Sequence, residues 1–588
     1  MLSMKPLDKL NVLAIDTETC GLYGTLHRLG ILNADGKKVW LTLEQAKVQK
    51  QWRKMVNAAD VVVGHNLKYD AHILKRDVDF ELPWSKVYDT MVMAAMIVPV
   101  DKAKDLLALS IAYVDGYEGD EDVVLDDYTK SHKLVGKMKG RFDQIPDTIL
   151  RPYTMRQLLN TLCLFAYFYP NMPECFEARE RGLTEVLFAC EWRGFPIDTK
   201  TLTKAKDELE AEMAVRSKRI RKAIDFEVGA KGWTKWLQVK LLKMEVAEGL
   251  SFERTPGGNR EPQISTAEDV LAPYVDRYPF IADYAAYKYA QKLAGTYING
   301  ILSHMGPDGC VHTSLSSTST RTGRLSSSEP NLQNITGKDT QSTAAFVRRA
   351  FLGRKGFVTT GIDYRQLEFR LAACLSHDLA GMAEIDQGFD MHTATAANVV
   401  AYKDHGGPIP YDQVDKPLRT LGKRFNFAII YGMGVAKLAV SLGITEQMAR
   451  ALKEQYFAHY SGIRRTIFQV MRQAKEQSCV YLPSGRRLRL PRTENYKAFN
   501  YLVQGGAAEI VKQAMIDVFA LLRDCRSNLL LQIHDELIVE FANDEYKDLA
   551  PQVVRLMKAA SEFPMDVEVV RWQGNWSRTR ELKRLAAA

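Results

Sequence analysis

Two carboxylates far apart in the chain stand where flanking apolar residues could hold them rigidly for metal chemistry. Asp363 ends an apolar run expected to form a strand over 357–362, with a helix after it. Asp535 lies with His534 and Glu536 between two apolar runs, where a simple tight turn would favour Asn-Gly or Asp-Gly. Such carboxylates could bind two Mg²⁺ ions about 3.5–4 Å apart, which is phosphoryl-transfer geometry. Taken alone, Asp363 could instead be a helix cap.

A second group of residues has the spacing and chemistry to bind a triphosphate. Arg419, Lys423, Phe427 and Tyr431 follow at four-residue steps, which drift by about 40° each and so share one helix face. The cations could hold phosphates, and the rings could stack on a sugar and a base. The alternative is an amphipathic helix with a solvated basic edge.

Charge is concentrated in the same part of the sequence. Positions 416–497 contain 16 Lys and Arg residues against four acids, a net charge of +12, whereas the rest of the chain carries −4. This stretch is expected to meet phosphates.

The amino-terminal part contains a further set of candidate metal ligands. Asp16 and Glu18 are two positions apart at the end of an expected strand, so both can point to one side of it. Solvated surface acids are the alternative to a two-metal site here. The candidates in this part are Asp16, Glu18, Asn66, Asp70, Tyr153 and Gln157.

The elements that must position these residues indicate several domains. With 588 residues and 46% apolar content, the chain is long enough for about three to five domains. Short apolar strands at 11–15 and 61–63 alternate with helical stretches through about residue 170. Acids crowd the stretch 101–127, and from 199 to about 297 the pattern is long, charged and helical.

Composition argues against several other classes of protein. The longest apolar run, Met91 to Val100, is about half a membrane-spanning helix, and no signal-peptide core is visible near the amino terminus. Eight cysteines are scattered singly, which argues against a zinc site and a disulfide framework. We therefore expect a cytoplasmic protein that is not attached to a membrane.

The segments around Asp363, the basic helix and Asp535 resemble motifs A, B and C of the A-family DNA polymerases, in that order. The pattern Arg419-x3-Lys423-x7-Tyr431-Gly432 is highly specific, and the resemblance extends from about residue 191 to 576. It implies a right-hand fold that binds a DNA primer-template and dNTPs and uses Mg²⁺. The catalytic residues that it implies are Asp363, Asp535, Glu536 and Lys423.

The same resemblance implies further roles. Glu368 occupies the position at which the family crowds the 2′-hydroxyl of a ribonucleotide. The implied nucleotide-binding residues are Arg419, Lys423, Phe427, Tyr431, Glu368 and His392. The implied DNA-binding residues are Arg324, Asn331, Gln333, Arg348, Asn500, Gln504 and His534, and Lys292, Thr296 and Tyr297 resemble the thumb base.

Two positions depart from the polymerase pattern. Arg365 stands where motif A usually has serine, and the pattern assigns it no role. The expected thumb tip, residues 232–242, lacks the sequence motif common in the family, so no DNA contacts are assigned there.

The amino-terminal motifs resemble the 3′–5′ exonuclease domain of many A-family enzymes. The resemblance implies metal binding by Asp16, Glu18 and Asp70, with Tyr153 orienting a water molecule. The third exonuclease motif should read Tyr-x3-Asp, but Gln157 supplies a neutral amide. Little or no exonuclease activity is therefore expected.

Two further expectations concern a substitute for the missing carboxylate and the domain layout. Asp143 or Asp147 could swing in for the missing carboxylate, although both lie upstream of Tyr153 and off the helical spacing. The exonuclease strand begins almost at the amino terminus, so no 5′-nuclease domain is expected. This compact layout resembles phage replicative polymerases.

We expect a multidomain α/β and α+β protein, an RNase H-like exonuclease domain followed by a right-hand polymerase that works as a monomer. The expected parts are the exonuclease-like domain at 1–170, linker, thumb and start of the palm at 171–345, palm at 346–375, fingers at 376–515 and C-terminal palm at 516–588. A stand-alone exonuclease with a non-catalytic DNA-binding region is the alternative, but it leaves Asp363, Lys423 and Asp535 without a purpose. A degenerate accessory subunit is disfavoured because the polymerase positions carry competent residues.

Overall fold

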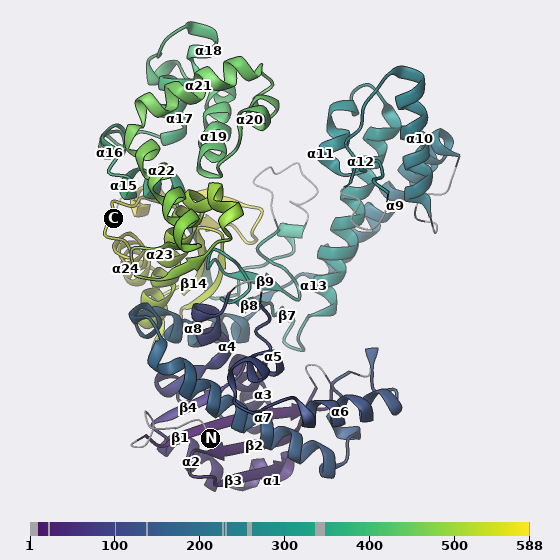
Figure 1. Cartoon of the computed structure of the whole chain (residues 1–588), viewed down its shortest axis with the longest axis vertical. Coiled ribbons are helices and arrows are strands. Elements are labelled where there is room, and N and C mark those ends of the chain that lie inside the picture. Colours follow the sequence, from purple (N-terminus) through teal and green to yellow (C-terminus); the bar gives the residue numbers. More distant parts are fainter. Residues whose placement is uncertain are drawn as a thin grey trace.

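Two five-stranded sheets, one near each end of the sequence, organise the part of the chain that is described (Figure 1). The structure is a computed structural model that describes residues 10–21, 24–99, 102–136, 139–225, 229, 232–255, 261–335 and 347–586. Val100, the end of the longest apolar run, lies outside these ranges, as does the expected domain boundary at 345. The domain boundaries at 170, 375 and 515 stay predictions.

The first sheet is mixed and has helices on both faces. Its order is β3 (Lys38–Thr42), β2 (Leu26–Asn33), β1 (Val12–Thr19), β4 (Val61–Gly64) and β5 (Val87–Asp89). Strand β4 is parallel to β1 and β5, whereas β2 is antiparallel to β1 and β3. Strand β1 is largely apolar because both faces are covered: Val12 and Ala14 join a core with α7 (Asp147–Phe168), and Leu13 and Ile15 join one with α3 (Leu67–Val78).

Further helices complete this part of the molecule, which lies at the bottom of Figure 1. They are α1 (Leu43–Val48), α2 (Gln51–Ala58), α4 (Thr90–Ile97), α5 (Leu106–Tyr113) and α6 (Asp120–Ser131). The π-helical turn η6 (Phe176–Glu180) and α8 (Arg181–Arg193) then lead into the rest of the chain.

A helical arm extends to the upper right of Figure 1, as the charged helical pattern predicts. It contains α9 (Thr199–Ile224), α10 (Trp233–Glu248), α11 (Glu268–Leu271), α12 (Pro279–Lys292) and α13 (Asn299–Ser303). The arm has an apolar core of its own, to which Ile220, Leu237 and Leu241 contribute. Short strand pairs accompany it, in which β6 (Phe195–Pro196) pairs with β7 (Cys310–Val311) and β8 (Ser314–Ser316) pairs with β9 (Ser326–Ser328).

The second sheet is antiparallel. Its order is β13 (Asn528–Ile533), β14 (Glu536–Ala542), β10 (Phe357–Tyr364), β15 (Val567–Trp572) and β16 (Thr579–Glu581). The long helix α23 (Ala498–Leu522) and α24 (Tyr546–Ala559) share one apolar core with these strands, and α25 (Lys583–Ala586) lies near the end of the chain. The strand predicted at 357–362 is confirmed and continues to Tyr364.

A mainly helical group between β10 and α23 forms the upper left of Figure 1 and has its own apolar core. Its elements are α15 (Leu367–Leu375), α16 (Leu379–Asp386), α17 (Met391–Thr395), α18 (Tyr402–His405), α19 (Lys416–Ile430), α20 (Val435–Leu442), α21 (Glu446–His459), α22 (Ser461–Gln477), β11 (Cys479–Tyr481) and β12 (Arg487–Arg489). Among the described residues, no helix is both long and apolar enough to cross a bilayer.

One expectation about the carboxyl-terminal hairpin is wrong. The sequence suggests that His534, Asp535 and Glu536 all lie at its tip, but only His534 and Asp535 form the turn. Glu536 is the first residue of β14 and pairs with Asp363 across the sheet. The polar Glu536 extends the strand because its backbone joins the β10 ladder.

Candidate functional site

Three carboxylates lie in one row across the central sheet. Asp363 on β10 is directly opposite Glu536 on β14 and directly opposite Glu568 on β15. Opposite residues of antiparallel strands point to the same face with Cβ atoms about 4.5–5.5 Å apart, so these acids are neighbours. Gly361 makes room, since a Cβ there would overlap Glu536 Oε1. Sequence reasoning missed Glu568, for which a single acid in an apolar strand was the only signal.

The turn that carries Asp535 is attached to the end of β10. The backbone N–H of Tyr364, next to Asp363, donates to the carbonyl oxygen of Asp535 at 3.1 Å. His534 has a left-handed backbone, with φ +55°. The structure therefore brings together the two regions that sequence reasoning proposed as one metal site.

The electrostatics of Asp535 fit a cation. Burial raises the pKa of Asp535 to about 6, against the opposing effect of Arg324, whose Nη2 lies 3.9 Å from Asp535 Oδ1. A divalent cation would relieve this burial cost, and Asp363, Asp535 and Glu536 provide the oxygen donors that Mg²⁺ prefers. Among the residues described, no three such side chains already surround one point, so binding would require side-chain rotation.

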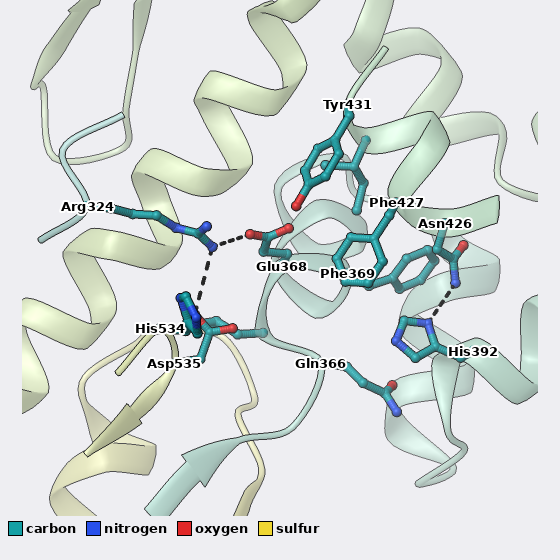
Figure 2. A pocket seen from close by; sticks show the side chains of 12 residues that line it. Arg324, Gln366, Glu368, Phe369, His392, Asn426, Phe427, Tyr431, His534 and Asp535 are labelled. Atoms are coloured by element: carbon teal, nitrogen blue, oxygen red, sulfur yellow. Dashed lines mark hydrogen bonds and ion pairs between the residues drawn. The ribbon is translucent and has the colours of Figure 1, made fainter. Parts of the chain in front are cut away.

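A cavity of about 300 Å³ adjoins Asp535 (Figure 2). Its lining includes Arg324, Glu368, Phe427, Tyr431 and Asp535. Arg324 donates to Glu368, which is buried, and burial raises the pKa of Glu368 while Arg324 opposes the rise. Dashed lines in Figure 2 join Arg324 to both Glu368 and Asp535.

Helix α19 carries the side chains that were predicted to share one helix face. Asp415 caps its first turn by accepting from Leu418 N–H at 2.7 Å, and Tyr431 directly follows its last residue. Lys423 Nζ lies 5.9 Å from the Phe427 ring centre, and the ring centres of Phe427 and Tyr431 are 5.7 Å apart. The common face predicted from four-residue spacing is therefore confirmed over these residues.

Arg419, at the start of this face, is held by an acid that sequence reasoning missed. Its Nη2 and Nε donate to the two carboxylate oxygens of Asp390 at 2.7 and 3.0 Å. Burial would raise the pKa of Asp390, but the hydrogen bond from Arg419 and those from Thr393 lower it to about 2. Arg419 therefore reaches a phosphate only if it shares or leaves Asp390.

His392 borders the cavity as a neutral ring. Burial lowers the pKa of His392 to about 4, and Arg419 and Lys423 add to the effect against that of Asp390. Asn426 Oδ1 accepts from Thr395, and its Nδ2 lies 3.2 Å from His392 Nδ1. This places the hydrogen of the neutral ring on Nε2, where it can be donated.

The expected DNA-binding residues come from several elements. Asn500 and Gln504 are one turn apart on α23 and are partly exposed in a helix that is otherwise mostly buried there. Gln333 is buried and donates to Gln532 Oε1 at 2.8 Å, whereas Asn331 Oδ1 accepts from Asn334 N–H at 3.1 Å.

Arg348 is packed beside the carboxylate row. Its guanidinium lies 4.2 Å from the Trp576 ring centre, and Nε and Nη2 donate to the Ile335 carbonyl oxygen at 3.1 and 3.0 Å. Burial lowers the pKa of Arg348, and Glu536 opposes the shift. Arg348 therefore lies near Glu536, one of the three carboxylates in the row.

Arg365, to which the pattern assigned no role, joins distant parts of the central sheet. Its side chain lies 3.2 Å from Glu581 on β16 and 3.6 Å from Asp566, and its N–H donates to the Asp566 carbonyl oxygen. It ties the residue after β10 to the edge strand.

Amino-terminal acids form a second candidate site, in which Glu18 and Asp70 are buried and Asp16 is partly buried. Thr17 donates from its N–H and its hydroxyl to Asp70 Oδ1 at 2.8 and 2.6 Å, which fixes α3 against β1. Burial raises the pKa of Asp16 to about 6, and burial together with Asp16 raises the pKa of Glu18 to about 8 and that of Asp70 well above its usual range. Asp16 therefore lies near Glu18 and near Asp70, and a divalent cation would relieve the cost of their charges.

Helix α7 covers the same site. Thr154 donates to Glu18 Oε1 at 2.6 Å, and Tyr153 lies close enough for Glu18 and Asp16 to help burial raise its pKa. Gln157, one turn beyond Tyr153, is buried and donates to Asp122 of α6. Sequence reasoning did not assign Asp122, although it belongs to the acid-rich stretch 101–127.

Three other expectations are resolved at this site. Asp143 is paired with Arg141 and Asp147 with Arg28, so neither is the carboxylate nearest Gln157. The Asn66 side chain is exposed, and its N–H donates to Asp89 Oδ1 at 3.0 Å, so its place is at the start of α3 beside the site.

Family models match two parts of the chain. The model described as "DNA polymerase family A" matches residues 199–577, and the model described as "3'-5' exonuclease" matches residues 3–134. The second match contains Asp16, Glu18 and Asp70 but ends before Tyr153 and Gln157.

Relatives agree with these matches. DNA polymerase I of Chloroflexus aurantiacus is 30% identical over 508 residues, which cover 83% of this chain and 51% of that protein. The thermostable DNA polymerase I of Thermus filiformis is 30% identical over 497 residues, covering 79% of this chain and 56% of that protein. The chain therefore spans about half the length of these relatives.

A solved structure shares the fold. The POL domain of Pol1 from M. smegmatis, in complex with DNA primer-template and dNTP, superposes with a TM-score of 0.76. The likeness covers 99% of this chain and 96% of that chain at 24% identity. The expected exonuclease-plus-polymerase fold class is confirmed.

Proposed function

The chain belongs to DNA polymerase family A, and we propose that it adds deoxynucleotides to the 3′ end of a DNA primer under the direction of a template. One observation carries the proposal. The strand that holds Asp363 and the turn that holds Asp535 meet beside a cavity bordered by Phe427 and Tyr431 of the α19 face. The solved relative that shares this fold contains a primer-template and a dNTP, which supports these ligands.

The carboxylates would bind metal, and the cationic side chains would bind the phosphates. Asp363, Asp535 and Glu536 would hold Mg²⁺, which when bound would activate the primer hydroxyl and neutralise the triphosphate by a two-metal arrangement. Lys423 and Arg419 would bind the phosphates from the start of the α19 face. Because Lys423 is exposed, it can reach a phosphate without first breaking a buried contact.

The cavity lining would select and orient the nucleotide. Phe427 and Tyr431 offer rings for the sugar and base, and His392 offers a neutral Nε2–H to a phosphate oxygen. Glu368 occupies space beside Tyr431 and would crowd a 2′-hydroxyl. The primer-template would contact Arg324, Asn331, Gln333, Arg348, Asn500, Gln504 and His534.

Primer extension tests this function. The purified chain is mixed with Mg²⁺, dNTPs and a labelled primer on a template whose next bases are known, and a primer without template serves as the control. We expect template-dependent lengthening by the encoded bases. A stand-alone exonuclease would only shorten the primer, and lengthening that ignored the template would also contradict the proposal. A monomer and a role in phage replication stay predictions.

We propose a second, weaker activity, the removal of nucleotides from a primer 3′ end at the Asp16, Glu18 and Asp70 site. The amide of Gln157 compensates a divalent cation less well than a carboxylate would, which supports impaired proofreading. Degradation of a labelled mismatched primer is compared for the chain and Gln157→Asp, with extension rate measured in parallel. The variant should degrade it faster at unchanged extension rate. Equal degradation rates would contradict the assigned impairment.

A further inference from the structure

The replacement of the fourth exonuclease carboxylate by Gln157 is accompanied by a specific contact. Gln157 is only 4% exposed, and its Nε2 lies 3.0 and 3.2 Å from the two oxygens of Asp122. The Tyr117 hydroxyl donates to the same carboxylate. Asp122 is therefore held between α7 and the segment before α6.

This contact fixes the orientation of the Gln157 amide. A carboxylate accepts hydrogen bonds and does not donate them, so the nitrogen of the Gln157 amide must face Asp122. The amide oxygen, Oε1, is left on the other side. Gln157 is three positions after Thr154, which binds Glu18, and four after Tyr153, so all three residues share one face of α7.

Neighbouring acids are already neutralised, which distinguishes Asp122. Glu121, the preceding residue, is paired with Arg156 at 2.8 Å. Asp143 and Asp147 are paired with arginines as described above. The charge of Asp122, in contrast, meets an amide and a hydroxyl, and it contributes to the electrostatic field at Tyr153 together with Glu18 and Asp16.

We propose that Asp122 and Gln157 act as a pair in place of the fourth carboxylate, with Gln157 Oε1 presented to the metal site and Asp122 supplying the negative charge behind it. Asp122 is then a positioning residue, because it acts through Gln157. A carboxylate that accepts from a ligand's N–H orients the ligand and makes its metal-binding atom more basic. This inference rests on the exonuclease site proposed above and names how that site retains metal affinity.

Metal binding tests the pair without relying on catalysis. Mn²⁺ is titrated into the full chain carrying Asp363→Ala and Asp535→Ala, which removes the polymerase site, and free Mn²⁺ is measured by electron paramagnetic resonance. In this background Asp122→Asn should weaken Mn²⁺ binding about tenfold, as loss of an outer partner does at other metal sites. The introduced amide keeps one oxygen that can accept from Gln157, so the helix contact can persist while the charge is lost.

The effect should disappear when residue 157 is itself a carboxylate. In Gln157→Asp the side chain binds the cation directly and has no N–H from which Asp122 could accept, so Asp122→Asn should change Mn²⁺ affinity by no more than about twofold. Glu121→Gln, which removes a neighbouring charge already paired with Arg156, is the matched control and should leave affinity within about twofold. An equal loss of affinity in both backgrounds, or no loss in either, would overturn the proposal.

Degradation of a mismatched primer by the chain with an intact polymerase site separates this inference from the proposed exonuclease function. A loss of Mn²⁺ affinity that depends on Gln157, without any degradation, would support the pair and contradict the activity. Degradation that is equally fast with and without Asp122→Asn, together with unchanged Mn²⁺ affinity, would support the activity and overturn the pair. Thermal unfolding of each variant shows whether a lost affinity reflects a lost fold. The double variant with Gln157→Asp then decides, because a fold damaged by Asp122→Asn would lose affinity in that background as well.

Discussion

At the scale of single residues, oppositely charged side chains in the proposed polymerase site are paired with one another. Arg324 donates to Glu368 and lies 3.9 Å from Asp535, so one cation pairs with a buried and a partly exposed carboxylate. Asp390 in turn pairs with Arg419. A bound metal would take the place of the arginine beside Asp535, and a bound triphosphate would take the place of the aspartate beside Arg419. These side chains could therefore exchange partners during a reaction cycle.

Glu368→Ala should weaken the discrimination against ribonucleotides. Removing this buried side chain from the cavity leaves room for a 2′-hydroxyl, and we expect the ratio of ribonucleotide to deoxynucleotide incorporation to rise by about tenfold or more, equivalent to about 1.4 kcal/mol. Single-nucleotide incorporation kinetics with rNTP and dNTP measure it. An unchanged ratio would mean that Glu368 does not border the sugar.

His392 should make folding stability depend on pH. Because its folded pKa of about 4 is below its ordinary 6.5, the unfolded chain takes up this proton first, so stability is lost as pH falls from about 6.5 towards 4. Between pH 7 and 4.5 this amounts to about 2–3 kcal/mol.

Urea unfolding of the parent and of His392→Gln at pH 7 and 4.5 measures this loss of folding stability. Between these pH values the parent should lose about 2–3 kcal/mol more than the variant. His405→Gln, an exposed histidine at the end of α18, is the control and should behave like the parent. Equal pH dependence in parent and His392→Gln would show that His392 titrates normally.

Local patterns predicted the residues whose role depends on spacing within one element. The shared face of α19 follows from helix geometry alone, and the alternation of Asp16 and Glu18 follows from a strand. Glu568, Asp390 and Asp122 could not be predicted in this way. Each becomes part of a site through pairing or packing with a segment that the local pattern does not identify.

At the scale of elements, a buried charge cluster fastens η6 to α23. Lys512 Nζ donates to both oxygens of Glu180 at 2.8 and 2.9 Å, and Arg486 Nη1 donates to Glu180 at 2.7 Å. Glu180 and Lys512 are each 1% exposed. Burial would raise the pKa of Glu180, but the charges of Lys512 and Arg486 lower it to about 2. The cluster stays ionised near neutral pH.

Glu180→Gln should destabilise the fold by about 3–5 kcal/mol, because it leaves Lys512 and Arg486 buried without their counter-charge. Glu177→Gln is the matched control: Glu177 is on the same turn, and its pair with Arg181 is partly exposed, so about 0.5 kcal/mol or less is expected. Chemical unfolding of both variants measures the difference. Similar losses of stability in the two variants would show that the buried cluster does not stabilise the contact between η6 and α23.

Strands were predicted best where the apolar pattern was continuous. The strand β10 and the hairpin β13–β14 follow from apolar runs, and the long helix α9 follows from a charged helical pattern, although β10 and β1 are longer than expected. The place of Glu536 in β14 was missed because a polar residue at the edge of an apolar run reads as a turn. Its pairing with Asp363 depends on sheet register, which the run itself does not contain.

At the scale of the whole molecule, the amino-terminal sheet is fastened to the polymerase part by polar contacts. Glu191 on α8 accepts from Lys68 and lies 2.8 Å from His72, both on α3, and it accepts from the Leu315 N–H at 2.5 Å. The Arg489 side chain donates to the Ile97 carbonyl oxygen at 2.8 Å. The two proposed metal sites therefore lie on different sheets of one connected molecule (Figure 1).

The most direct test of the central claim is single-turnover primer extension by Asp363→Ala and Asp535→Ala, with DNA binding measured by fluorescence anisotropy. Loss of a metal-binding carboxylate removes several kcal/mol of transition-state stabilisation, so extension should fall by about a hundredfold or more. DNA affinity should change little because the basic surface persists. Asp548→Ala, an exposed acid on α24, is the control and should extend normally. Extension by either site variant at more than a few per cent of the parent rate, with DNA still bound, would contradict the assignment.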